Sequence, residues 1–204
     1  MLQSFISVIG YLLIDMSNSI MRRNLPYDFR QRRHELGEQG EINVGKILCK
    51  YFGHRKLSYG YDDYSSGTNG YPDIVLKTNP VIAIEVKSIA PFTKKETSNG
   101  IYKSAGYVAI RREQWYEELK FARERLGKLI LVVEVRLRDR GLYFWFNSDQ
   151  IEEYMKKLKG ERIHIHLDDI LNKGRSLIYP DDIKYLEYWN QQTPVDNDYQ
   201  MNIV

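Results

Sequence analysis

Residues 70–88 read Gly70-Tyr-Pro-Asp-Ile-Val-Leu-Lys-Thr-Asn-Pro-Val-Ile-Ala-Ile-Glu-Val-Lys-Ser88. The runs 74–76 and 81–84 are short, apolar and rich in β-branched side chains, as strands are. Residues 77–80, between the two runs, have the composition of a turn. The stretch therefore predicts a β-hairpin of two paired strands.

Two carboxylates and an ammonium group are expected at the open end of this hairpin. Asp73 enters the first strand, Glu85 leaves the second, and Lys87 shares a strand face with Glu85. Mg²⁺ and Mn²⁺ accept one or two protein carboxylates and complete their shell with water and phosphate oxygens. Asp73 and Glu85 are thus predicted metal ligands, with the carbonyl of Val86 as a further ligand. Lys87 would orient or deprotonate the attacking water, or stabilise charge on the phosphate.

The order Pro72-Asp73, eleven residues, then Glu85-Val86-Lys87 resembles the motif of the PD-(D/E)XK nuclease superfamily. The apolar runs beside the charged ends support this interpretation. From spacing alone, the alternative is an exposed Glu–Lys pair at a strand end. The resemblance implies an α/β fold with a restriction-endonuclease-like core, in which helices flank a mixed central β-sheet. It also implies Mg²⁺-dependent cleavage of DNA, with Mn²⁺ as a substitute.

Composition indicates one α/β domain with appendages. The 204 residues are 43% hydrophobic, enough for a core, and the net charge of +3 does not by itself indicate a nucleic-acid partner. The one cysteine, Cys49, excludes an intrachain disulfide framework and is compatible with a cytoplasmic location. We expect an N-terminal apolar segment and basic arm (1–33), a nuclease core (34–147) and a C-terminal extension packed on the core (148–204).

The N-terminal region contains an apolar segment and a run of arginines. Residues 5–14 are too few to span a bilayer, so no membrane segment is predicted. Two alternatives stay open for this segment. It forms a short helix that packs on the domain or on a partner subunit, or it results from a non-native early start of the chain. The arginines between 22 and 33 would follow a phosphate backbone or form a solvated surface.

A helix is predicted over residues 34–52, with Gly53 as its C-cap. Glu41 lies on the apolar row of this helix, where a carboxylate needs a partner such as a metal site. Superfamily members often carry a glutamate on the first core helix, and the resemblance assigns this role to Glu41, with Glu38 as the rival. A glutamate placed only for the helix dipole is the alternative for both.

The resemblance to archaeal Holliday-junction resolvases, a branch of this superfamily, suggests further site residues. The segment 111–126 is predicted to be an amphipathic helix in which Gln114 supports the site. A plain amphipathic helix is the alternative. In the loop 54–70 a serine, Ser66 or Ser65, would assist catalysis or contact DNA, and an ordinary surface loop is the alternative. The stretch 90–107 is expected to be irregular and contains Lys94 and Lys95. The predicted DNA contacts are Ser66, Lys94, Lys95, Arg111 and Arg112.

Several elements are expected after this helix. The pattern Ile163-His-Ile-His-Leu167 invites a metal site, but no third ligand is evident, and a solvated strand face is favoured. The remaining predicted elements are strands at 130–135, 142–146 and 162–167, a capped helix at 147–159 and a helix at 180–191.

These features predict a metal-dependent endodeoxyribonuclease. A Holliday-junction resolvase, a restriction-type nuclease and a mobile-element nuclease share such residues and stay open, so the DNA partner is branched or duplex. A non-catalytic DNA-binding subunit that retains the fold is the alternative from another class. The resemblance also implies a homodimer, because symmetric cutting of two strands needs two sites related by a twofold axis.

Overall fold

The structure is a computed structural model that describes residues 29–59, 71–97, 100–125, 127–138 and 140–192. Its centre is a six-stranded mixed sheet in the order β1-β2-β3-β7-β8-β10. Strands β3 and β7 are parallel, and the other neighbouring pairs are antiparallel. The strands of this sheet are β1 (Leu57–Tyr59), β2 (Ile74–Leu76), β3 (Ile82–Ile89), β7 (Lys128–Arg136), β8 (Gly141–Asn147) and β10 (Arg175–Ser176).

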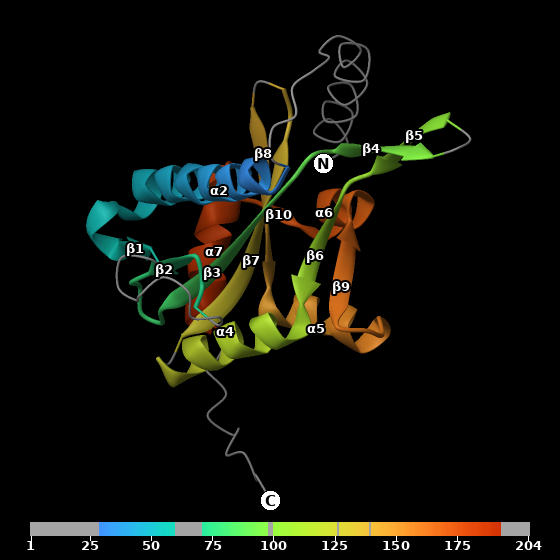
Figure 1. The fold of residues 1–204 in the computed structure, drawn as a ribbon. Helices are drawn as coiled ribbons and strands as arrows, with labels where there is room; N and C mark the ends of the chain where they lie inside the picture. The colour runs from blue at the N-terminus through green and yellow to red at the C-terminus, as the bar shows by residue number, and fades with distance from the viewer. Residues whose placement is uncertain (1–28, 60–70, 98–99, 126, 139, 193–204) are drawn as a thin grey trace, which may run out of the picture.

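Helices and two small ribbons surround this sheet (Figure 1). The ribbon of β4 (Phe92–Thr97) and β5 (Gly100–Ala105) projects outward, whereas β6 (Tyr107–Arg111) pairs with β9 (Arg162–His166) beside the sheet. The helices are α2 (Phe29–Phe52), the 3-10 turn η1 (His54–Lys56), α4 (Arg112–Glu124), α5 (Ser148–Lys157), α6 (Leu167–Lys173) and α7 (Pro180–Gln192).

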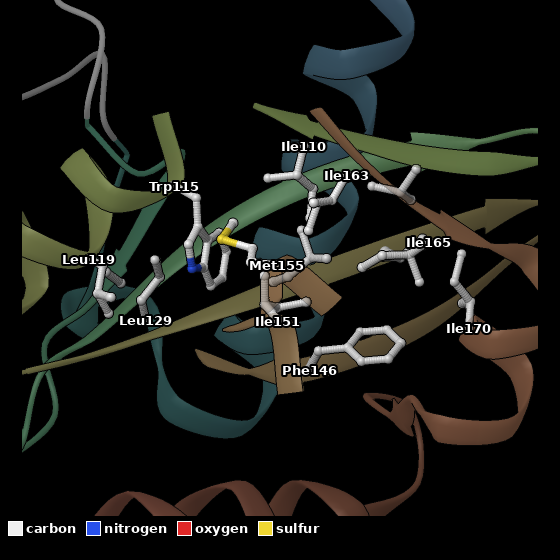
Figure 2. Close-up of a cluster of buried hydrophobic side chains, with 14 of the residues drawn as sticks. Ile110, Trp115, Leu119, Leu129, Phe146, Ile151, Met155, Ile163, Ile165 and Ile170 are labelled. Atoms are coloured by element: carbon white, nitrogen blue, oxygen red, sulfur yellow. The ribbon is translucent and has the colours of Figure 1, made fainter. Parts of the chain in front are cut away.

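Strands β3 and β7 are buried on both faces, and alternate residues supply two separate cores. On one face Ile84, Val86 and Val132 pack with α2 and α7. On the other face Ala83, Leu131 and Val133 pack with α4, α5, α6 and the β6–β9 ribbon. Figure 2 shows this second core. Since successive side chains of a strand alternate between faces, Glu85 and Lys87 belong to the face that α4 covers.

The predicted fold class is confirmed, because the chain forms a mixed central sheet flanked by helices. The 70–88 hairpin appears as β2 and β3, and Gly53 ends α2 with a positive φ of 84°. The predicted capped helix is α5, where Asn147 and Gln150 form a capping box. The remaining predicted helices and strands correspond to α2, α4, α7, β7, β8 and β9.

One part of the secondary-structure prediction is wrong. The stretch 90–107 is not irregular, since it forms the β4–β5 ribbon and the start of β6. Helix α6 and strand β10 were not predicted. Residues after 147 also contribute to the body of the fold, because β9 pairs with β6 and β10 with β8. The apolar segment 5–14 and the arginines at 22 and 23 lie outside the described residues.

Helix α2 is attached to the sheet through a buried carboxylate. Glu134, which is 2% exposed, accepts hydrogen bonds from four side chains. The donors are Asn43 Nδ2 (2.9 Å), Ser88 Oγ (2.7 Å), Arg136 Nε (2.7 Å) and Tyr143 Oη (3.0 Å). A Cβ atom at Gly40 would collide with Ser88 Oγ, so glycine permits this close approach of α2 to β3.

Helix α7 is attached through a buried lysine. Lys128 Nζ donates to the carbonyl oxygens of Trp189 (2.8 Å) and Asn190 (2.6 Å), near the end of α7. The same ammonium lies 4.7 Å from the centroid of the Trp189 ring. A cation at this position satisfies terminal carbonyls and opposes the negative end of the helix dipole. Among the described residues, no helix is long and apolar enough to cross a membrane.

The Glu134 network makes a testable contribution to stability. Burial opposes ionisation of Glu134, but hydrogen bonds from Asn43, Ser88 and Arg136 outweigh it and hold its pKa below the ordinary value. A lowered folded-state pKa stabilises the protein above the unfolded-state pKa, and this stability is lost as pH falls through the folded-state value. We expect Glu134→Gln to lower the free energy of unfolding at pH 7 by roughly 2 to 4 kcal/mol.

Chemical denaturation at pH 7 and pH 3 measures this difference, which should shrink at pH 3. Glu117→Gln, at an exposed position of α4, is the matched control and should change stability by less than about 0.5 kcal/mol. An equal loss at both pH values would contradict the stabilising role of the Glu134 charge.

Candidate active site

The β2–β3 hairpin brings Asp73 and Glu85 together at its open end. Ile74 pairs with Ile84 at the end of the ladder, so the next pair in register is Asp73 opposite Glu85. Opposite residues of an antiparallel pair project to the same face, about 5 Å apart at Cβ. The predicted convergence of the two carboxylates is therefore present.

Asp73 is held in place by the main chain of β3. Val86 N donates to Asp73 Oδ2 at 2.7 Å. In a strand the N–H and C=O of one residue point to the same side. Because the β2 ladder ends at Ile84, the Val86 carbonyl faces the same edge as Asp73, beyond the last paired residue of β2.

Glu85 and Lys87 form an ion pair on the α4 face. Lys87 Nζ donates to Glu85 Oε1. The Glu85 side chain is 1% exposed, whereas that of Lys87 is 31% exposed. The Glu85 Oε2 atom is buried and accepts no hydrogen bond from an amide, hydroxyl or ammonium group of the described residues, and the carboxyl groups of Asp73 and Glu118 are its nearby polar neighbours. A buried carboxylate oxygen without a donor is costly, and either a bound cation or a proton shared with a neighbouring carboxyl group would satisfy it.

Helix α4 adds an amide and a third carboxylate. Gln114 Nε2 donates to Glu85 Oε1 (3.0 Å) and to Glu118 Oε1 (2.8 Å). Gln114 therefore lies at the site, as predicted. Glu118 was not predicted, although it is fully buried. Its position was visible in the sequence, because Glu118 lies three residues after Trp115 and four before Ala122 on the apolar stripe of the helix.

Burial raises the pKa of all three carboxylates. It raises the pKa of Asp73 to about 8, and the nearby charge of Glu85 adds to the effect. It raises the pKa of Glu85 to about 7, although the ammonium of Lys87 opposes this. Burial also raises the pKa of Glu118 to about 7, although the hydrogen bond from Gln114 lowers it. For Lys87, burial lowers the pKa, but the charges of Glu85 and Asp73 outweigh it and the net change is upward.

The donor set suits a hard divalent cation. The described residues contain no group of three or more histidine, cysteine or acidic side chains arranged to hold a metal. Mg²⁺ needs only one or two carboxylates, since it keeps several waters. Asp73, the Glu85 Oε2 atom and the Val86 carbonyl are all oxygen ligands, which Mg²⁺ and Mn²⁺ prefer. These residues therefore fit the predicted ion.

The two candidate glutamates of α2 lie on a different element. Glu41 is half-buried and Glu38 is exposed. Helix α2 covers the sheet face opposite to the one that carries Glu85 and Lys87. The role of Glu41 as a third carboxylate of the site stays a prediction, with Glu38 as the rival.

The predicted DNA contacts have different positions. Arg111 is exposed at the end of β6. The guanidinium of Arg112 instead caps the end of α5, since it donates to the carbonyls of Met155 (2.7 Å), Leu158 and Gly160 (2.5 Å). These hydrogen bonds give the Arg112 side chain a structural role, and its predicted contact with DNA phosphate stays a prediction. Lys94 and Lys95 lie on β4, where their side chains are outside the description, and Ser66 and Ser65 lie outside the described residues.

The histidine pair of β9 has the position that its alternation predicted. His164 and His166 are exposed, whereas Ile163 and Ile165 are buried. Both rings lie near Tyr107, with centroid distances of 4.5 Å for His164 and 6.1 Å for His166. Because the described residues supply no three-ligand group, the solvated strand face remains the better interpretation.

Comparisons with known proteins find similarity to solved structures. No family model matches the chain, and no curated protein matches it. A solved structure with partial similarity is a Holliday junction resolvase from Archaeoglobus fulgidus, an archaeal hyperthermophile. The two chains are 14% identical, the match covers 70% of this chain and 97% of the resolvase, and the TM-score is 0.47.

The burial of Glu118 predicts a specific pH effect on stability. The pKa of Glu118 is about 7 in the folded protein and has an ordinary value of 4.5, so as pH rises this carboxyl group ionises in the unfolded chain before it ionises in the folded protein. Stability should therefore fall between these two pH values. We expect Glu118→Gln, measured with a chelator present, to raise the free energy of unfolding at pH 8 by roughly 1 to 3 kcal/mol. The difference should vanish near pH 4.

Denaturant titrations at pH 4 and pH 8 measure both quantities. Glu117→Gln, one residue away and exposed, is the control and should show no such pH-dependent gain. A destabilised Glu118→Gln protein at pH 8 would indicate that the ionised carboxylate is itself stabilising.

Proposed function

We propose that this protein is a Mg²⁺-dependent endonuclease that hydrolyses phosphodiester bonds in DNA. The observation that carries the proposal is the convergence of Asp73, Glu85 and Lys87 at the open end of the hairpin, with the Val86 amide bound to Asp73. The order of these residues along the chain matches the PD-(D/E)XK motif. Spacing and geometry therefore support the same chemistry.

Asp73, Glu85 and the Val86 carbonyl would hold the ion, and Glu41 remains a candidate for a direct or water-mediated contact. When bound, Mg²⁺ or Mn²⁺ supplies Lewis-acid polarisation of a phosphate oxygen and lowers the pKa of a coordinated water. The Glu85 Oε2 atom, which accepts no hydrogen bond from an amide, hydroxyl or ammonium group of the described residues, is the feature that best supports this assignment.

Lys87 and Gln114 act on the reacting groups in different ways. Lys87 Nζ uses one hydrogen bond on Glu85, and an ammonium has three donors, so donors remain to orient the attacking water or stabilise charge on the phosphate. Gln114 is a positioning residue, because its amide holds both Glu85 and Glu118. This contact fixes which oxygen of Glu85 stays available.

The form of DNA and the assembly are parts of the proposal. A twofold homodimer would present two such sites to opposite strands and produce paired cuts. Resolution of four-way junctions and site-specific cutting of duplex use the same active-site residues, so the substrate is determined by surfaces outside the site.

Substitution of the site should abolish cleavage without unfolding the protein. Asp73→Asn retains an oxygen that can accept from Val86 N, and Lys87→Met retains the aliphatic stem. We expect each variant to reduce the rate of Mg²⁺-dependent nicking of supercoiled DNA by at least about 100-fold. Lys77→Ala, an exposed lysine in the turn of the same hairpin, should cut at the wild-type rate.

Gel assays on supercoiled plasmid, four-way junctions, linear duplex, flaps and single strands provide the measurement. Nicking by Asp73→Asn and Lys87→Met at wild-type rates would show that the assigned site is wrong. DNA binding without cutting of any substrate by the wild-type protein would favour the non-catalytic DNA-binding subunit.

Metal binding can be tested separately from cleavage. Saturating Mn²⁺ or Mg²⁺ should raise the melting temperature, since a ligand at 100 times its Kd stabilises the folded state by about 2.7 kcal/mol. Asp73→Asn should lose most of this increase, whereas Lys77→Ala should keep it. Differential scanning calorimetry with and without EDTA measures the effect, and an equal increase in all three proteins would exclude Asp73 as a ligand.

A further inference from the structure

The outer face of the β6–β9 ribbon combines positive charge with aromatic rings. The two strands alternate between buried and exposed residues, so one face packs into the core and the other meets solvent. The exposed side chains of this outer face are Tyr107, Arg111, Arg162, His164 and His166. None of them belongs to the candidate active site.

An open pocket of about 510 Å³ lies along this face, between β9 and the helices α5 and α6. Four cationic side chains line it, together with His164, His166 and Tyr154. Asp169 is the acidic residue of the lining and pairs with Lys173 at 2.5 Å. The cationic residues are Lys157, Lys159, Arg162 and Lys173.

The positive charge on this face is only partly compensated. Arg111 and Arg162 are directly opposite each other in the antiparallel ladder, where like charges repel. Lys157 pairs with Glu153 (3.5 Å), but Arg111, Arg162 and Lys159 form no ion pair with any described residue. A bound phosphate group would relieve this repulsion, so the charge pattern favours a polyanionic ligand.

The rings add a second kind of contact. The centroids of His164 and Tyr107 are 4.5 Å apart and the ring planes are inclined by 38°. At the pocket, the Lys173 ammonium lies 5.2 Å from the centroid of the Tyr154 ring. Aromatic platforms beside cations are the features that bind unpaired bases and their phosphates in single-stranded nucleic acid.

This face is connected to the candidate active site. Strand β6 ends at Arg111 and α4 begins at Arg112, two residues before Gln114. The Arg112 guanidinium ties the start of α4 to the carbonyls of Met155 and Gly160, which flank the pocket residues of α5 and β9. Arg111, at the end of the ribbon face, is therefore three residues from Gln114 along the chain.

We propose that the β6–β9 face and its pocket bind an unpaired DNA strand next to the cleavage site. This inference rests on the proposed function, in that it takes DNA as the substrate. In a duplex the bases stack on one another and their faces are not available to His164 or Tyr107. The pocket volume suits a single nucleotide rather than a duplex. The substrate class is thus DNA with a single-stranded segment, such as a flap or an overhang.

Binding in EDTA tests the inference without cleavage. A fluorescein-labelled 20-nucleotide single strand is titrated with protein, and anisotropy gives the Kd at several salt concentrations. We expect the double variant Lys159→Ala with Arg162→Ala to weaken binding at least tenfold. Its slope of log Kd against log salt should fall by about 1.4, since each lost phosphate contact removes about 0.7 on a single strand.

His164→Ala tests the stacking contribution. It should weaken binding about tenfold with an unchanged salt slope, because the lost contact is not ionic. The charge-matched control, Lys56→Ala with Lys184→Ala, changes two exposed lysines on η1 and α7, outside the ribbon face, and should alter the Kd less than twofold. Circular dichroism checks that all variants are folded.

Three results would overturn the inference. The first is that the Lys159/Arg162 variant and its control bind the single strand with equal Kd. The second is that the same variant weakens binding of blunt duplex as much as binding of the single strand. The third is that free dAMP binds more tightly than the oligonucleotide. If strand binding in EDTA depends on Lys159, Arg162 and His164, the inference stands even where the nicking assays fail. A wild-type preference for flaps over blunt duplex that the double variant loses would support both proposals.

Discussion

Burial of β3 and β7 on both faces is the constraint on which the rest of the structure depends. Each strand must supply apolar side chains to two cores, so helices are required on both sides of the sheet. Polar side chains within these strands then have no water to solvate them. Glu85 and Glu134 are both buried in this way, and each needs partners from the surrounding elements.

The two buried glutamates of the sheet, Glu85 and Glu134, differ in hydrogen bonding and in pKa although both are buried. Glu134 has donors on both oxygens, and its pKa is lowered. Glu85 has donors on one oxygen only, and its pKa is raised to about 7. Saturated hydrogen bonding marks Glu134 as a structural carboxylate that fixes α2. Glu85 Oε2 accepts no hydrogen bond from an amide, hydroxyl or ammonium group of the described residues, so Glu85 is the less completely hydrogen-bonded of the two carboxylates.

Local patterns predicted the hairpin, the main helices and the group of Asp73, Glu85, Lys87 and Gln114, because each depends on periodicity or motif spacing within a short segment. The β4–β5 ribbon was missed because residues 92–97 carry few apolar side chains, so their alternation has no hydrophobic signal. The cap that Arg112 forms on α5 depends on residues more than forty positions later, which no local pattern reveals. Glu118 was missed although its helical phase was visible.

The Arg112 cap connects two elements that are far apart in the sequence. It joins the first turn of α4, which orients Glu85 through Gln114, to the end of α5 at the rim of the pocket. The position of the first turn of α4, and with it the position of Gln114, therefore depends on how α5 ends.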